Sequence, residues 1–368
     1  MPNSTQDEKF MRAALTEARK GLGKTSPNPL VGCVLVKDGA IVARGHHRGA
    51  GLPHAEVEAL AAHQGKDAKG IVLYVNLEPC CHQGRTGPCT EAILAAGIPV
   101  VVVGMVDPNP LVNGKGIARL REAGITVRAG VLEKECRRLN EAFERWVTAG
   151  RPHVTLKAAV SLDGRIAGAG GEPRWISGEE SRAEVHRIRN AVDAVLVGAN
   201  TVLRDDPLLT TRVAKGPSRT AHRVVLDAKL RIPPAARVLV PVKGAPPTTV
   251  FAADDAAEAK EMAISASGAK VVRIAKSESG GIDLPAAMAY LARAGVTSVL
   301  VEGGAQVFTS FLQARAVDRV LVFVAPRLLG DSGTAAVGAL ATPIALADVG
   351  IKRFGDDVMF EGTPDWKA

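Results

Sequence analysis

Short runs of apolar and β-branched residues alternate with amphipathic segments along almost the whole chain of 368 residues. Such short runs favour buried strands, whereas apolar residues that recur every three or four positions favour helices. Strands that alternate with helices predict an α/β fold with a mostly parallel sheet. In the first half we expect strands at 31–36, 41–43, 71–76, 100–106 and 125–129, and helices at 7–21, 54–63, 88–96, 116–123 and 132–147.

The alternation is interrupted at residues 148–153, Thr-Ala-Gly-Arg-Pro-His, and then resumes. Glycine and proline break the pattern there after a charged helix, which is typical of a domain boundary. We therefore expect two domains, at residues 1–149 and 150–368. For the second we expect strands at 154–160, 193–198, 223–227, 248–252, 271–274, 297–302 and 317–324, and helices at 179–190, 284–294 and 304–315.

The residues with the clearest chemical meaning are a His-x-Glu pair at 54–56 and two Pro-Cys pairs that end at 80 and 89. The imidazole of His54 and the thiolates of Cys80 and Cys89 make three protein ligands, and a catalytic zinc keeps its fourth position for water. Both cysteines are expected near helix starts, where the helix dipole favours thiolate. Glu56 can then carry a proton from the water to a leaving amine. This arrangement is the pattern of zinc nucleobase deaminases.

Each of these residues also has a structural interpretation. A His-x-Glu pair on a helix commonly lies on the surface, and a single cysteine commonly fills a core. A purely structural zinc would need a fourth ligand, which Cys81 or His82 could supply. The spacing between the cysteines is longer than the common Cys-x-x-Cys, because residues 81–88 intervene. This insert contains His82, Arg85 and Thr86, which can bind an anionic or polar ligand.

The composition narrows the class of partner. The formal net charge is +8, and aromatic residues make up only 4% of the chain. Few aromatics for base stacking, and the absence of a long lysine or arginine run, favour small anionic substrates over nucleic acid. No stretch has the length and apolarity of a signal core or a membrane span, so we expect a cytoplasmic protein that has no membrane partner and keeps its five cysteines reduced.

Eight segments spread over both halves carry a family resemblance. In the first half they are SPNPLVGCVLVKDG (26–39), PHAEVEAL (53–60), LEPCCHQGRTGPC (77–89) and DPNP (107–110). In the second half they are LKAAVSLDGRIA (156–167), RWIS (174–177), NTVLRDDPLLTTR (200–212) and VEGG (301–304). In these segments the chain resembles the bifunctional riboflavin-biosynthesis deaminase–reductase family. Cys81 departs from the family pattern, in which a small polar residue such as serine is expected; Cys80, which follows Pro79 directly, stays the expected ligand.

The resemblance implies a cytidine-deaminase-like αβα domain followed by a dihydrofolate-reductase-like α/β domain. The first would use zinc to remove an amino group from 2,5-diamino-6-ribosylamino-4(3H)-pyrimidinone 5′-phosphate. The second would use NADPH to reduce the ribosyl group of the product to ribityl. The resemblance also implies that Asn28 holds the pyrimidine, that His47, His82 and Arg85 line the pocket or reach the phosphate, and that the chain forms a homo-oligomer.

For the reductase half, the resemblance implies two sets of contacts. NADPH would bind at the loop 304–310 and at residues before it, namely Ala159, Trp175, Thr201, Asp205, Gly304, Ala305, Gln306, Val307, Phe308, Thr309 and Ser310. The ribosyl phosphate would be held by Lys157, Pro173, Arg189, Leu209, Arg212 and Glu302. The residue types agree, because two arginines can bind a phosphate through paired hydrogen bonds. A strand that runs into two glycines and a helix also suits a phosphate, although a tight turn accounts for it equally well.

Two other functions stay open at this point. The first is a deaminase of nucleosides or tRNA with a non-catalytic second domain, which would have no need of Lys157, Arg189 and Glu302. The second is a non-enzymatic binding protein stabilised by zinc, in which Glu56 would be dispensable and metal removal would unfold the domain. The sequence shows no dedicated proton donor for a reduction step, which leaves Lys157 or water.

Overall fold

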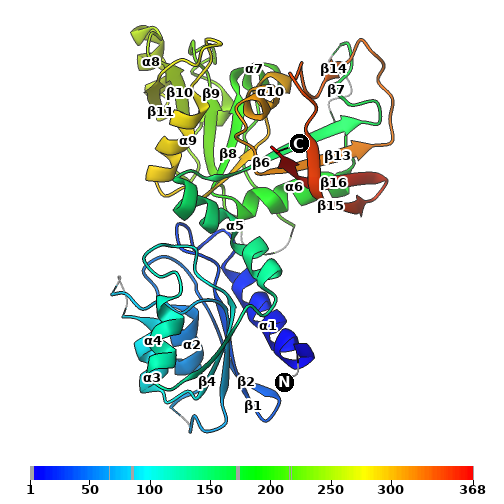
Figure 1. Cartoon of the computed structure of the whole chain (residues 1–368). Helices are drawn as coiled ribbons and strands as arrows, with labels where there is room; N and C mark the ends of the chain where they lie inside the picture. Colours follow the sequence, from blue (N-terminus) through cyan, green and yellow to red (C-terminus); the bar gives the residue numbers. More distant parts are fainter. Residues whose placement is uncertain are drawn as a thin grey trace. The chain divides into compact units, whose positions relative to one another are not determined.

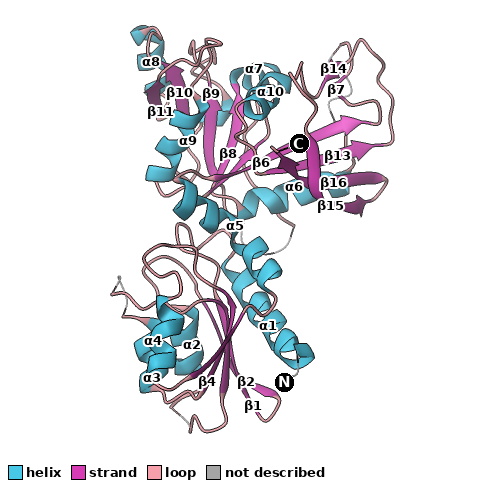
Figure 2. Ribbon diagram, in the orientation of Figure 1, coloured by secondary structure: helices cyan, strands magenta, loops and turns pink. Residues whose placement is uncertain are grey.

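The computed structural model describes residues 4–65, 67–83, 87–170, 175–214, 216 and 218–367. The chain divides into two compact units, Met1–Arg151 and Pro152–Ala368, each with its own sheet (Figures 1 and 2). Gly150, with a φ of 64°, ends the last helix of the first unit in the left-handed conformation that favours glycine. Among the described residues, no helix is long and apolar enough to cross a membrane.

The first unit is built on a five-stranded sheet in the order β2-β1-β3-β4-β5. β1 pairs antiparallel with β2 and β3, whereas β3, β4 and β5 run parallel. In the β1–β2 turn Asp38 and Gly39 both have positive φ, at 51° and 75°, as a tight hairpin turn requires. The strands are β1 (Gly32–Lys37), β2 (Ala40–His46), β3 (Val72–Leu77), β4 (Val100–Met105) and β5 (Thr126–Ala129).

Helices cover both faces of this sheet (Figure 1). Successive strand residues point to opposite faces, so Leu73 and Val75 reach one core and Tyr74 reaches the other. The first core is shared with α2 (Ala55–Ala62), α3 (Cys89–Ala95) and α4 (Lys115–Glu122). The second is shared with α1 (Ser4–Ala18) and α5 (Glu133–Ala149), and the short 3-10 helix η1 (Arg19–Gly21) follows α1.

The second unit is built on a nine-stranded sheet in the order β11-β10-β9-β8-β12-β6-β13-β16-β15. From β11 to β13 all neighbouring strands run parallel, and β16 and β15 add an antiparallel edge. Two further strands, β7 (Arg165–Ala167) and β14 (Thr334–Ala335), form a separate pair. The strands of the large sheet are β6 (His153–Ser161), β8 (Ala194–Gly198), β9 (His222–Leu226), β10 (Thr249–Ala253), β11 (Lys270–Ile274), β12 (Ser298–Val301), β13 (Arg319–Ala325), β15 (Ala345–Phe354) and β16 (Asp357–Asp365).

Three apolar clusters fill the second unit. The largest joins the sheet to α9 (Leu284–Arg293) and α10 (Ala305–Gln313). A second lies under α7 (Ala199–Asp205), α8 (Glu258–Ser265) and the 3-10 helix η2 (Arg237–Leu239). A third packs Val185 of α6 (Glu179–Ala191) against Leu321, Phe323 and Met359.

Every helix and strand expected from the sequence is present, with ends that differ by three residues or fewer. Among the described residues, seven elements of the second unit were not expected: β7, α7, η2, α8, β14, β15 and β16. α7 has only seven residues, α8 buries only Ile264 of the side chains described, and β15 is exposed along most of its length. Such segments lack the one-sided apolar pattern on which a sequence prediction depends. Residues 304–310 do not form a loop, because after Gly304 they make up the first turns of α10; their contact with NADPH stays a prediction.

Candidate active sites

The three predicted zinc ligands converge at one end of the first sheet. His54 immediately precedes α2, Cys80 lies in the loop after β3, and Cys89 is the first residue of α3. Their ligand atoms all lie within 4.8 Å of one another. The His54 Nδ1 atom is 3.2 Å from Cys89 Sγ and 3.5 Å from Cys80 Sγ.

These distances fit a tetrahedral zinc. With bonds of about 2.3 Å to sulfur and about 2.0 Å to nitrogen, a nitrogen and a sulfur ligand lie roughly 3.6 Å apart. The separations observed are close to this value, and they identify Nδ1 as the ligating nitrogen of His54. One imidazole and two thiols is also the donor set of a catalytic rather than a closed structural site. The residues present therefore fit the metal.

The loop that carries Cys80 is fixed by its backbone. The N–H of Thr90 donates to the Cys80 carbonyl oxygen at 3.1 Å, and the N–H of Cys89 donates to Cys80 Sγ at 3.4 Å. Hydrogen bonds from the Cys89 thiol and from His54 stabilise the Cys80 thiolate, and they outweigh burial and lower the pKa of Cys80 below its ordinary value. Cys80 is thus prepared to bind a cation.

Glu56 lies on the first turn of α2 and is only 3% exposed. Burial, followed by the negative charge of Cys80, raises the pKa of Glu56 to about 7. A carboxyl group with a pKa near neutrality can both accept and release a proton at physiological pH. This protonation behaviour matches the role expected for Glu56.

Asn28 and His47 lie together beside the metal ligands. The His47 Nδ1 atom is 3.1 Å from the Pro53 carbonyl oxygen, so it carries the ring proton and donates it to this carbonyl. The His47 Nε2 atom can then accept from the Asn28 amide nitrogen, 3.0 Å away. The His47 ring stands edge-on to the His54 ring, with 5.3 Å between centroids. His82 is exposed, and Arg85 lies outside the described residues.

In the second unit, Glu302 directly follows β12 and meets two cations. Arg189 of α6 binds it through two contacts, from Nε to Oε1 at 2.5 Å and from Nη2 to Oε2 at 3.0 Å. The Lys157 Nζ atom, on the neighbouring strand β6, lies 3.6 Å from Oε2. Burial opposes ionisation of Glu302, but Arg189 and Lys157 outweigh it and lower its pKa to about 2. Burial also lowers the pKa of Lys157 below its ordinary value.

The segment with Leu209 and Arg212 lies against the same helix. Leu209 is 4% exposed and has a φ of 52°. The Arg189 Nη1 atom donates to the Thr210 carbonyl oxygen at 3.4 Å. The N–H of Arg212 donates to His186 Nδ1 at 3.3 Å. The structure therefore brings Lys157, Arg189, Glu302 and the 209–212 segment together, whereas Pro173 lies outside the described residues.

Part of the predicted cofactor set lies where two helices begin side by side. α7 and α10 follow β8 and β12, which are adjacent parallel strands. The Asn200 amide donates to the Gln306 side-chain oxygen at 2.8 Å, and a Cβ added at Gly304 would lie 3.9 Å from Thr201 Oγ1. Paired helix starts at the carboxyl ends of parallel strands are a common site for phosphate groups, so these residues fit a nicotinamide dinucleotide.

Close packing at these helix starts depends on glycine. A Cβ at Gly198 or at Gly303 would lie 2.6 Å from the side chain of Val307. Val307 thus packs between the two strand ends instead of projecting into open space. Of the other predicted α10 residues, Phe308 is buried in the core, and the hydroxyls of Thr309 and Ser310 donate to carbonyl oxygens one turn earlier.

The remaining predicted cofactor residues have different surroundings. Trp175 is 56% exposed, and its described contacts are with Arg182, which stacks on its ring, and with Arg327, which donates to its carbonyl oxygen. Asp205 is the last residue of α7. Ala159 packs against the apolar cluster that Val185 of α6 forms with residues of β13 and β16.

Comparisons with known proteins match both units. Residues 4–105 match the zinc-binding region of cytidine and deoxycytidylate deaminases, and residues 152–360 match the RibD C-terminal domain. The riboflavin biosynthesis protein RibD of Aquifex aeolicus is 41% identical over 356 residues, which cover 96% of this chain and 97% of that protein. The chain belongs to the RibD family.

Other RibD proteins extend the match. The RibD protein of Escherichia coli is 41% identical over 89% of each chain. A solved structure from Thermotoga maritima, a diaminohydroxyphosphoribosylaminopyrimidine deaminase/5-amino-6-(5-phosphoribosylamino)uracil reductase, superposes with a TM-score of 0.84 at 37% identity and covers 98% of this chain and 99% of its own. RibD of Acinetobacter baumannii superposes with a TM-score of 0.85 at 35% identity, over 99% and 100% of the two chains.

Membership of the RibD family confirms several predictions. The chain is a bifunctional enzyme of riboflavin biosynthesis, with a deaminase domain and a reductase domain. The α/β fold class and the cofactors zinc and NADPH are confirmed as well. A nucleoside or tRNA deaminase with a non-catalytic second domain is not favoured, because the RibD C-terminal domain spans that half of the chain.

Two further residues of this RibD-family chain escaped the sequence analysis. Glu78 is 3% exposed, and its carboxylate accepts hydrogen bonds from the N–H groups of Asp107, Gly114 and Ile117. It thereby ties the loop before Cys80 to the start of α4. His186 was also missed, although its position three residues before Arg189 on one helix face could have indicated it.

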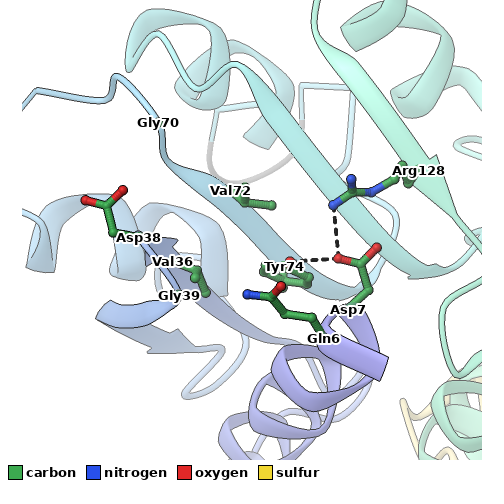
Figure 3. A pocket seen from close by; sticks show the side chains of 9 residues that line it. All are labelled: Gln6, Asp7, Val36, Asp38, Gly39, Gly70, Val72, Tyr74 and Arg128. Atoms are coloured by element: carbon green, nitrogen blue, oxygen red, sulfur yellow. Dashed lines mark hydrogen bonds and ion pairs between the residues drawn. The ribbon is translucent and has the colours of Figure 1, made fainter. Parts of the chain in front are cut away.

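A cavity of about 200 Å³ lies on the α1 side of the first sheet, and none of its lining residues is a predicted site residue (Figure 3). The Tyr74 hydroxyl donates to Asp7 Oδ1 at 2.8 Å, and Arg128 Nη2 donates to the same oxygen at 3.0 Å. Burial, followed by Asp7, raises the pKa of Tyr74 well above its ordinary value. This cluster ties α1 to β3 and β5, so we interpret it as structural.

Proposed function

We propose that residues 1–149 deaminate 2,5-diamino-6-ribosylamino-4(3H)-pyrimidinone 5′-phosphate, and that residues 150–368 then reduce the ribosyl group to ribityl with NADPH. The observation that carries the proposal is the cluster of His54, Cys80 and Cys89 with the buried carboxyl of Glu56 on the same helix start. The Arg189–Glu302–Lys157 cluster in the second unit supports the second reaction.

In the deamination, His54, Cys80 and Cys89 would hold the zinc, which when bound would make a water molecule nucleophilic near neutral pH. Glu56 takes a proton from that water as the oxygen of the water adds to the ring carbon that bears the amino group. Glu56 then gives a proton to the departing nitrogen, the carbon–nitrogen bond breaks, and ammonia leaves. Asn28, held by His47, orients the pyrimidine through its amide group.

In the reduction, bound NADPH would supply a hydride, and the protein positions the sugar. The glycosidic carbon becomes electrophilic when its ring oxygen bond breaks and a carbon–nitrogen double bond forms. Glu302 stabilises the positive charge on this group, because its carboxylate stays ionised beside Arg189 and Lys157. This carbon would be the one that takes the hydride. Lys157, whose pKa is lowered by burial, gives a proton to the ring oxygen as its bond to the glycosidic carbon breaks, and Lys157 regains this proton from water.

A turnover assay with the purified zinc-loaded protein tests both reactions. With the diaminopyrimidine ribosyl phosphate as substrate, we expect ammonia release followed by NADPH oxidation. Glu56→Gln should lower both by about a hundredfold or more and leave zinc content unchanged, because Glu56 shuttles a proton but is not a ligand. Glu58→Gln, on the same helix but paired with Arg48 at the surface, is the matched control and should stay active.

The outcomes of that assay separate the alternatives. Ammonia release without NADPH oxidation would show that the second domain is not the proposed reductase. Full activity in Glu56→Gln would remove the proposed proton shuttle. A zinc-loaded wild-type protein with neither activity would contradict the proposed substrate.

We further propose that the protein works as a cytoplasmic homo-oligomer. The edge strand β15 and its neighbour β16 expose apolar side chains: Val349 is 56%, Ile351 62% and Phe360 38% exposed. An exposed apolar sheet edge favours association with another chain. Sedimentation equilibrium should find an oligomer that Ile351→Lys dissociates, and cell fractionation should find the protein in the cytoplasm. A wild-type monomer would contradict the first expectation, and recovery with membranes the second.

A further inference from the structure

The segment from Leu209 to Arg212 contains a residue in a strained backbone conformation. Leu209 is a buried residue with a φ of 52°, in the left-handed region where a residue with a side chain is strained. Such a conformation persists only where the surroundings impose it, and it is commonly found at functional sites. Contacts from outside the segment must therefore fix its position.

Two side chains of α6 form hydrogen bonds with this segment, one as a donor and the other as an acceptor. Arg189 donates to the carbonyl oxygen of Thr210, and His186, one turn earlier on the helix, accepts from the N–H of Arg212. Residues three apart on a helix share one face, so both side chains reach the segment from the same side. Arg189 is in turn held by Glu302, which links the segment to the reductase cluster.

The hydrogen bond from Arg212 fixes the chemistry of the imidazole. Nδ1 can accept only when it carries no proton, so the ring proton of the neutral form lies on Nε2. Four charged groups act on this ring: Arg189 on its own helix, Arg212 in the segment, Lys157 on β6 and Glu302 after β12. Burial first, and then the two arginines, lower the pKa of His186, which keeps it neutral at physiological pH.

We propose that His186 is a positioning residue of the reductase, which sets the backbone at Arg212 so that the Arg212 guanidinium meets the phosphate of the substrate. This inference rests on the proposed function, because it takes the phosphorylated sugar as the ligand of the second unit. His186 then determines how strongly the enzyme prefers the phosphorylated substrate, and it leaves the hydride step itself to other groups.

Two substitutions separate this role from simple packing. His186→Leu keeps an apolar side chain of similar size on the helix but removes the acceptor. His186→Asn places a side-chain oxygen close to the position of Nδ1, so it restores the acceptor without the ring. The assay uses the full zinc-loaded chain, saturating NADPH, and 5-amino-6-(ribosylamino)uracil 5′-phosphate or its phosphate-free form as substrate.

For the phosphorylated substrate we expect His186→Leu to raise KM about tenfold, which is the effect of losing one hydrogen bond, here the one that positions Arg212. The kcat should stay within about threefold of wild type. His186→Asn should recover most of this loss. The KM for the phosphate-free substrate should not respond to either change. In an Arg212→Ala background, His186→Leu should add little, because the two residues act through one contact.

Several results would overturn the proposal. Equal loss of activity in both variants, with a lowered thermal transition, would make His186 a packing residue. Equal KM changes for the two substrates, or full additivity with Arg212→Ala, would show that it does not act through Arg212. A wild-type enzyme that oxidises no NADPH would instead refute the proposed reductase function, and the inference with it.

Discussion

At the scale of single residues, each of the two sites contains a buried carboxyl group, and the surroundings shift the two pKa values in opposite directions. The carboxyl group of Glu56 lies beside the negative charge of Cys80, and burial raises its pKa to about 7. Glu302 is buried as well, but Arg189 and Lys157 lower its pKa to about 2. One group is therefore suited to exchange protons, and the other to remain a fixed negative charge.

The low pKa of Glu302 makes the stability of the second unit depend on pH. Its folded pKa lies below the ordinary value of about 4.3, so the ionised form stabilises the fold above that pH. This contribution is lost as pH falls from about 4.3 through 2. Glu302→Gln should lower the free energy of unfolding of this unit by about 3 kcal/mol at pH 7, because it leaves two buried cations without their shared anionic partner. Urea unfolding followed by tryptophan fluorescence measures the change.

The difference in unfolding free energy between wild type and Glu302→Gln should shrink as pH falls from about 4.3 toward 2, because the folded wild type loses the stabilisation from ionised Glu302 over this range. Asp255→Asn, which removes the exposed partner of Lys276 in the same unit, is the control and should leave the free energy of unfolding nearly unchanged. A difference that stays constant from pH 7 to 2 would show that the charge of Glu302 does not stabilise the fold.

At the scale of elements, the zinc site is held by close backbone contacts between helices and strands. A Cβ at Gly45 on β2 would lie 2.3 Å from the Ala55 carbonyl oxygen of α2, which follows His54 directly. A Cβ at Gly116 on α4 would lie 2.0 Å from the Pro79 carbonyl oxygen, next to Cys80. Glycine at these positions lets the helices that frame the ligands approach the strand and the loop.

Gly116→Ala should therefore displace the loop with Cys80 and weaken zinc binding by about tenfold or more, because the added methyl group meets backbone atoms that cannot rotate away. Competition with a chromophoric chelator measures the affinity. Gly87→Ala is the matched control: it lies next to α3, with open space around the position of its Cβ. Unchanged zinc affinity in Gly116→Ala would mean that the loop tolerates the shift.

At the scale of the whole molecule, each unit has its own cores. The clusters around the zinc site contain only residues of the first unit, and those around Glu302 only residues of the second. Two domains with separate cores can lose function independently.

Removal of zinc should consequently abolish deamination and leave reduction intact. We expect the chelated protein to oxidise NADPH at the wild-type rate when it receives the deaminated intermediate directly. Zinc should then restore ammonia release from the diamino substrate. Loss of both activities on chelation would show that the metal also stabilises the reductase unit.

The sequence determined the zinc site almost completely, because its ligands lie in short motifs with Glu56 two residues from His54. The residue types and the motifs indicate the donor set, and the packing of α2 and α3 against the sheet then brings the donor atoms together. The alternation of strands and helices likewise predicted the α/β class. By contrast, β15 and β16 carry no one-sided apolar pattern, so their pairing could not be read from the chain.

The reductase cluster was decided by the tertiary structure. Lys157, Arg189 and Glu302 come from three elements far apart in sequence, and only the order of strands in the sheet makes β6 and β12 neighbours. The contact between His186 and the backbone of Arg212 has no local signal either, since the segment is placed by long-range packing. The sequence by itself determined which chemical groups are available to each site. The fold decided which charged groups that are distant in sequence lie close together, because their interaction depends on distance through space.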